Sequence, residues 1–114
     1  MIKMKFMKYI GIQWIYKPIG NCPVEAEGYF LNYYFYFKSR YNESTIQFAE
    51  SKLAWYYDNI EKSICIKLYQ NPFSAGWISE KKSILLIYKG CFLFSIYLLK
   101  NKIKSICKLL KLIP

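Results

Sequence analysis

The stretch from Tyr33 to Arg40 alternates in a way that predicts a β-strand. One face carries Tyr33, Phe35, Phe37 and Ser39, and the other carries Tyr34, Tyr36, Lys38 and Arg40. Shorter runs of the same kind predict strands over 10–15, 24–30, 44–50 and 64–69. Leu31 and Asn32 form a predicted reversal, because Asn tolerates the left-handed conformation that tight turns require. Together these runs predict an antiparallel meander.

Other segments interrupt the alternation. Pro18, Gly20 and Pro23 predict a turn-rich crossing between the first two strands. Residues 52–57 fit a short helix or another strand, and both alternatives stay open. Asn71 and Pro72 are expected to end the last strand.

The C-terminal region has a helical pattern. Ser79 is a predicted N-cap, and Glu80 follows in the first turn, where the helix dipole favours an acid. Gly90 is expected to weaken this helix and to end or bend it. From Asn101 a second amphipathic pattern begins, with its apolar stripe at Ile103, Ile106, Cys107, Leu110 and Ile113 and an opposite stripe at Lys104, Lys108 and Lys111. We expect this stripe to dock on the sheet; the alternative is an anionic membrane surface.

Residues 83–99 also need testing as a membrane span. As a helix they reach about 25 Å, short of the roughly 30 Å hydrocarbon core. Lys89 lies near the middle, at a cost of about 3 kcal/mol, which offsets much of the apolar gain. We favour a helix that covers the core, and a membrane span stays the alternative.

The predicted fold class is therefore α+β. A small antiparallel sheet of three to five strands is covered by one or two C-terminal helices. We expect one domain over 1–114, with a basic N-terminal segment at 1–9, the sheet at 10–70 and a Lys-rich helical region at 79–113.

Charge is distributed unevenly along the chain. The net charge is +10, and all seven acids lie between residues 25 and 80, so both ends are purely basic. This asymmetry suggests a polyanionic partner: nucleic acid, an anionic membrane or an acidic protein face.

Several chemistries are disfavoured by composition. Histidine is absent, which excludes catalytic triads and zinc sites that use it. The four cysteines are widely spaced and contain no CxxC, so we expect no metal, no cofactor and reduced thiols. Glu25 and Glu27 share a strand face and are the best paired carboxylates, but a solvated face explains them equally well. We expect a protein that is not an enzyme and has no signal peptide.

The candidate partner-binding residues combine aromatic and basic side chains. They are Tyr34, Tyr36, Lys38, Arg40, Lys100, Lys102, Lys104, Lys108 and Lys111. Aromatic rings beside cations are the chemistry of single-strand nucleic-acid binders, although cross-strand packing also explains aromatic strands.

Three short motifs carry a resemblance. Residues 20–28 (GNCPVEAEG), 35–40 (FYFKSR) and 75–80 (AGWISE) resemble motifs of a family of small bacterial and phage proteins. The resemblance implies an α+β fold and no particular activity. Small phage proteins of this class often block host proteins, and anti-CRISPR inhibitors are the prominent example.

The predicted function is accordingly a non-catalytic inhibitor in the bacterial cytoplasm. Its expected partner is a host defence protein, most concretely a Cas nuclease or its guide-RNA complex. The alternatives are a membrane-associated protein that uses residues 83–113 and a single-stranded nucleic-acid-binding module.

Overall fold

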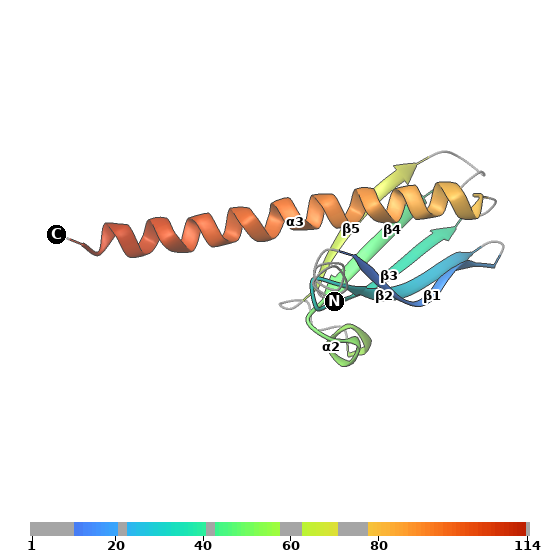
Figure 1. Cartoon of the computed structure of the whole chain (residues 1–114), viewed down its shortest axis with the longest axis horizontal. Coiled ribbons are helices and arrows are strands. Elements are labelled where there is room, and N and C mark those ends of the chain that lie inside the picture. Colours follow the sequence, from blue (N-terminus) through green and yellow to red (C-terminus); the bar gives the residue numbers. More distant parts are fainter. Residues whose placement is uncertain (1–10, 21–22, 41–42, 58–62, 71–77, 114) are drawn as a thin grey trace, which may run out of the picture.

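A computed structural model describes residues 11–20, 23–40, 43–57, 63–70 and 78–113 of the chain. Five strands and two helices make up these residues (Figure 1). In chain order they are β1 (Ile12–Ile19), β2 (Val24–Phe30), β3 (Tyr33–Arg40), β4 (Glu43–Ala49), α2 (Lys52–Tyr56), β5 (Ser63–Gln70) and α3 (Glu80–Lys111). The predicted α+β class is confirmed, and the open assignment of 52–57 resolves to a short helix.

The sheet is an antiparallel meander in the order β1-β2-β3-β4-β5. The β2–β3 hairpin keeps an unbroken register from Val24 opposite Ser39 to Phe30 opposite Tyr33. Its turn has positive φ at Leu31 (51°) and Asn32 (65°), so the predicted reversal is confirmed. Such a turn matches the right-handed twist of the strands that it joins.

β1 is longer than the sequence predicts. It runs through Pro18 to Ile19, where a turn was expected, and its register with β2 shifts on both sides of Tyr16. β1 is an edge strand of the described sheet, with a neighbouring strand on one side. Edge strands tolerate proline, although it has no N–H to donate. The predicted break at Asn71 and Pro72 and the third motif, up to residue 77, lie outside the described residues.

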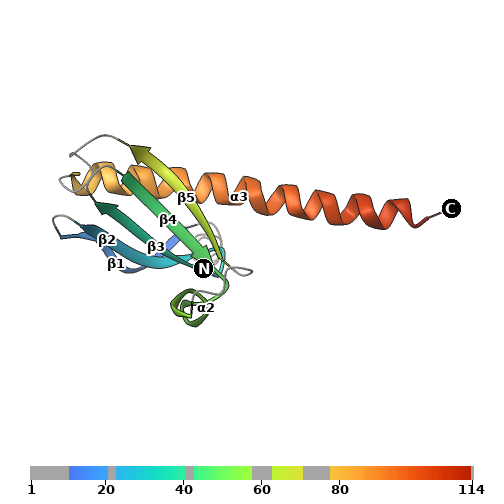
Figure 2. The same ribbon diagram turned by 180° about the vertical axis from the view of Figure 1, so that it is seen from behind.

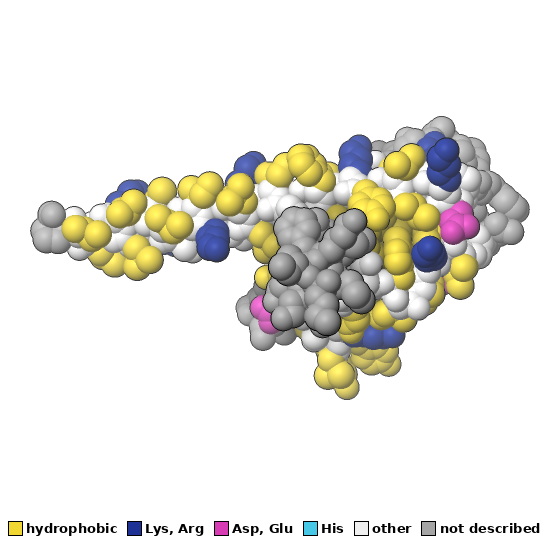
Figure 3. Space-filling view, viewed as in Figure 1, with side chains coloured by type: hydrophobic (Ala, Val, Ile, Leu, Met, Phe, Trp, Pro, Cys, Tyr) yellow, Lys and Arg dark blue, Asp and Glu magenta, His cyan; other side chains and the backbone are white. Residues whose placement is uncertain are grey.

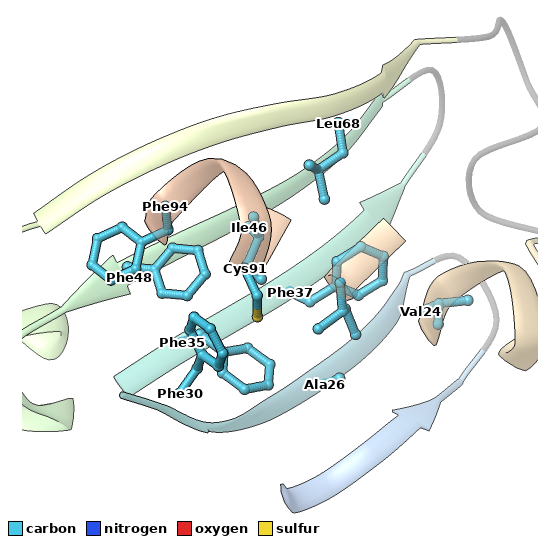
Figure 4. Close-up of a cluster of buried hydrophobic side chains, with 11 residues drawn as sticks. Val24, Ala26, Phe30, Phe35, Phe37, Ile46, Phe48, Leu68, Cys91 and Phe94 are labelled. Carbon is cyan, nitrogen blue, oxygen red and sulfur yellow. The ribbon is translucent and has the colours of Figure 1, made fainter. Parts of the chain in front are cut away.

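The core lies between one face of the sheet and the first half of α3 (Figure 4). Its buried members are Val24, Ala26, Phe30, Phe35, Phe37, Ile46, Phe48, Leu68, Ile87, Cys91 and Phe94. The inward face of β3 is the one that the alternation predicts, with Phe35 and Phe37 fully buried. Trp14 packs against this cluster and meets Phe35 edge to face.

α3 begins as the sequence predicts. The Ser79 Oγ accepts a hydrogen bond from the Lys82 N–H at 3.1 Å. The expectation that Gly90 ends or bends the helix is wrong, because α3 continues to Lys111. Gly90 is buried, and a Cβ atom there would lie 2.6 Å from the Ile46 Cγ2 atom, so glycine lets the helix approach the sheet closely.

The second half of α3 leaves the sheet (Figures 1 and 2). Every residue from Leu99 to Ile113 is exposed, so the predicted docking of the Ile103–Ile113 stripe on the domain is wrong. The physical reason is that α3 is longer than the strands on which it packs. A helix of 32 residues spans about 48 Å, whereas strands of seven or eight residues span about 25 Å.

Candidate interaction surface on helix α3

The first half of α3 has two distinct faces. Ser83, Ile87, Gly90, Cys91 and Phe94 face the sheet and are buried. On the opposite side, Leu85, Tyr88 and Phe92 are more than half exposed. Covering the core therefore uses only one side of this helix and leaves large apolar side chains on the other.

An apolar row follows this second face and is unbroken from Phe92 to Ile113. We call it the outer stripe and define it as Leu85, Phe92, Ile96, Leu99, Ile103, Ile106, Leu110 and Ile113. Ile96 is half-buried, and the others are 49–66% exposed. At about 100° per residue, these positions stay on one side of the helix from its first half into its projecting half. Figure 3 shows apolar side chains along the projecting half, with lysines between them.

The charged groups beside the outer stripe are all cations. Lys100, Lys102, Lys104, Lys108 and Lys111 are exposed, and no acid occurs after Glu80. At the helical angle, Lys100 and Lys102 lie on the two flanks of the stripe, whereas Lys104 and Lys108 lie on the opposite side. The surface is thus apolar along its middle and positive at its margins.

α3 is also long and apolar enough to cross a membrane. An 18-residue window within it has a mean hydropathy of 1.6, and 28% of that window is buried in the fold. Crossing would pull Ile87, Cys91 and Phe94 out of the core and expose the apolar face of the sheet. The described fold therefore opposes a span by this helix but leaves its outer side available to a partner.

The other face of the sheet carries the predicted aromatic contact residues. Tyr34 is fully buried, and its hydroxyl donates to Glu27. Tyr36 donates to Glu25 at 2.5 Å. Tyr34 is therefore wrong as a partner-binding residue, because its ring and its hydroxyl are already engaged within the fold.

Helix α2 covers this aromatic pair. The Trp55 ring packs on both tyrosines, with centroid distances of 5.5 Å to Tyr34 and 4.8 Å to Tyr36. Its Nε1–H donates to the Gln47 Oε1 atom at 2.8 Å, and Lys52 pairs with Glu27 at 3.5 Å. A stacking surface for nucleic-acid bases is therefore not open at Tyr34 and Tyr36. Lys38 is half-buried and Arg40 is exposed at the end of β3.

Glu25 and Glu27 do lie on one face of the sheet, as predicted. Each accepts a hydrogen bond from a tyrosine hydroxyl. Burial first, and then the hydrogen bond to Glu27, raise the pKa of the Tyr34 hydroxyl above its usual value. Burial and the bond to Glu25 raise the pKa of Tyr36 in the same way. Both hydroxyls thus stay protonated and donate hydrogen bonds to the two carboxylates across the sheet face.

The described cysteines are free thiols, namely Cys65, Cys91 and Cys107. Among the described residues, no group of three or more acids and cysteines is placed to hold a metal ion.

Part of the outer stripe was missed by sequence reasoning. From the sequence, residues 83–99 are expected to cover the core and a separate amphipathic pattern is expected from Asn101, so Leu85, Phe92 and Leu99 are not joined to the stripe of Ile103 and Ile106. The signal was present in the regular spacing of apolar residues across position 100.

No protein-family model, curated protein or solved structure matches this chain. The resemblance carried by the three short motifs stays a prediction.

Proposed function

We propose that this chain is a non-catalytic binding protein that attaches to an anionic membrane surface through the outer side of α3. The observation that carries the proposal is the outer stripe, an exposed apolar row that continues past the sheet and whose charged neighbours are all lysines. Helices with an apolar face and a Lys-rich polar face lie in the interface between lipid headgroups and acyl chains.

The projecting half of α3 supports the need for a partner. Residues 99–113 are exposed on all sides, so no packing within the described fold stabilises them. Isolated helices of this length are marginal in water, and most helical stability in proteins comes from packing of an apolar face. An exposed row of Leu and Ile marks an interaction site for the same reason.

The lysines beside the outer stripe favour an anionic membrane over a zwitterionic one. A lysine near an anionic bilayer contributes about 1 kcal/mol, and this contribution falls off within a Debye length. Lys100 and Lys102 flank the stripe, so their ammonium groups reach the headgroups while the apolar side chains enter the acyl boundary. A zwitterionic bilayer offers the apolar gain alone.

The fold sets the orientation. Because the sheet packs on one side of α3 and the outer stripe lies on the other, the helix would lie flat with the sheet domain in water. The core contacts of Ile87, Cys91 and Phe94 are then kept.

Vesicle flotation with the full chain tests the proposal. We expect binding to vesicles that contain phosphatidylglycerol, weak binding to pure phosphatidylcholine, and release as salt is raised. The Lys100→Glu/Lys102→Glu variant should bind anionic vesicles at least about 30-fold more weakly, the equivalent of about 2 kcal/mol.

A matched control carries the same change of net charge elsewhere. Lys17 and Lys67 are exposed on strands, and the ion pair of Lys67 with Glu43 is long (4.0 Å) and solvated. The Lys17→Glu/Lys67→Glu variant should bind nearly as well as the unchanged chain. Equal losses in both variants, or no binding to anionic vesicles at low salt, would refute membrane attachment.

Two other hypotheses stay predictions. For the inhibitor of a host defence complex, Arg40 and the lysines from Lys100 to Lys111 are exposed and stay candidate contact residues. The nucleic-acid module loses its stacking pair, since Trp55 and the carboxylates engage Tyr34 and Tyr36.

A further inference from the structure

The outer stripe has a seven-residue repeat. From Phe92 onwards its members are separated alternately by four and three residues: Phe92, Ile96, Leu99, Ile103, Ile106, Leu110 and Ile113. Apolar residues at this spacing form the seam of a left-handed coiled coil, in which a narrow stripe on one helix packs against the same stripe on another. In heptad notation, Ile96, Ile103 and Leu110 take position a, and the other four take position d.

We propose that, away from the membrane, a second copy of this chain covers the outer stripe, so that residues 92–113 of two α3 helices form a parallel coiled coil. The inference rests on the proposed function in one respect: the outer stripe binds either the membrane or the second copy. Membrane binding would then require the pair to open.

The position of the sheet agrees with this repeat. Ile87, Gly90, Cys91 and Phe94, which pack on the sheet, fall at positions b, c and f, on the side of the helix away from the seam. In the projecting half these positions are polar at Asn101, Lys104, Ser105, Lys108 and Lys111, and Leu112 is the apolar exception. From Phe92 onwards every seam position is apolar. Two copies joined at the seam would therefore carry their sheets on the sides of the helices that face away from the seam.

The flanking residues are compatible with the parallel arrangement. In a parallel pair, position g of one helix meets the following position e of the other. Lys100 at e would meet Ser95 of the second copy, and Lys102 at g would meet its Cys107. No two lysines are opposed along this part of the seam. Lys89 falls at position a, where two like charges would meet, so pairing is expected to begin at Phe92.

The remaining positive charge explains why the pair would be weak and sensitive to salt. Lys104, Lys108 and Lys111 lie on the outer sides of both helices, and repulsion between them is screened beyond about 8 Å at physiological salt. Added salt should therefore tighten the pair, whereas it loosens attachment to anionic lipid. The two salt dependences have opposite sign.

Sedimentation equilibrium of the full chain tests the inference. We expect a reversible monomer–dimer equilibrium that shifts toward dimer between 50 mM and 500 mM salt. The Ile103→Lys variant should weaken the dimer at least 100-fold, because it places two cations at one a position. Its matched control, Lys104→Ala, changes the next residue on the outer side and should not weaken the dimer. Neither residue touches the sheet, so both variants keep the fold.

Cross-linking tests the direction of pairing. With Cys22, Cys65 and Cys107 replaced by Ser, the Ile103→Cys variant should form a disulfide-linked dimer on mild oxidation, and Lys104→Cys should not. Equal cross-linking of the two variants, or none at position 103, would overturn the parallel seam.

The outcomes separate this inference from the proposed function. A chain that stays monomeric at every concentration, yet floats with anionic vesicles, overturns the coiled coil alone. A dimer that never binds vesicles overturns membrane attachment alone. The Lys100→Glu/Lys102→Glu variant should keep the dimer while it loses vesicle binding, since neither lysine opposes a charge in the pair.

Discussion

The ring of Phe94 stacks on the ring of Phe48, with centroids 4.1 Å apart and planes that differ by 3°. This contact fastens the middle of α3 to β4 (Figure 4), and Phe94 is the last buried residue of the helix. Two residues earlier in the helix, Phe92 points away from the sheet and is 66% exposed. The two phenylalanines mark the boundary between the core side of α3 and its interaction side.

Replacing these two rings should give opposite results. Phe94→Ala leaves a cavity in the core and should lower the free energy of unfolding by about 3–5 kcal/mol. Phe92→Ala, the matched control, should change it by less than about 0.5 kcal/mol in dilute protein. Urea denaturation followed by circular dichroism measures both values. Similar losses for both variants would mean that the outer side of α3 is also packed within the monomer.

Gly90 should resist replacement although glycine is a poor helix residue. Gly90→Ala gains about 1 kcal/mol of helix propensity but forces a Cβ atom against the Ile46 Cγ2 atom, and such overpacking costs about 1–3 kcal/mol. We expect a net loss of stability in urea titrations.

A double-mutant cycle identifies the cause of this loss. Ile46→Ala removes the opposing methyl group, so Gly90→Ala should cost at least about 1 kcal/mol less in that background. A stabilising Gly90→Ala in the unchanged chain would show that the helix does not approach the sheet this closely.

Ser83→Ala should stabilise the protein. The Ser83 Oγ is buried and has no hydrogen-bond partner among the described residues. Leaving a buried hydroxyl unsatisfied costs about 1–3 kcal/mol, so its removal should raise the free energy of unfolding by about 1 kcal/mol. The control is Ser105→Ala, which removes an exposed helical hydroxyl bonded to the Asn101 carbonyl and should change stability little. A loss of stability with Ser83→Ala would indicate a partner for this hydroxyl.

Stability should fall in alkaline solution because of the buried thiol of Cys91. Burial raises the pKa of this thiol from 9.0 to about 12, so the folded chain keeps a proton that the unfolded chain releases above pH 9. The unfolded state then binds fewer protons, and stability decreases as pH rises between 9 and 12, by about 1.4 kcal/mol per pH unit for this group. Tyr34, whose pKa is also raised, adds to the decline above pH 10.

The slope of stability against pH is the measurement for this prediction. Cys91→Ala should make the slope shallower between pH 9 and 11, whatever the variant's stability at neutral pH. Cys107→Ala, which changes an exposed thiol on the projecting half, should keep the original slope. The same slope in both variants would contradict the assignment to Cys91.

Local sequence patterns were sufficient for much of the fold. The alternation from Tyr33 to Arg40 predicted β3 with both its faces, since side chains of a strand point to alternate sides. Leu31 and Asn32 predicted the hairpin turn, and Ser79 predicted the start of α3. These features depend on backbone preferences and on hydrogen bonds between residues that are close in the chain.

Whether the side chains on a given face are buried or exposed depended on segments far apart in the chain. Tyr34 and Lys38 share a strand face, but Trp55 from α2 buries only the tyrosine, and no periodicity within β3 encodes that contact. Gly90 resembled a helix breaker because only the position of Ile46 on β4 explains why a glycine is needed inside the helix.

The sequence by itself determined that the C-terminal region is helical, apolar on one side and rich in lysine. Only the tertiary structure decided that a single helix runs through Gly90 and extends beyond the sheet. The physical reason is the difference in length between α3 and the strands: once the core side of the helix is covered, its outer stripe and its last four turns have no partner among the described residues.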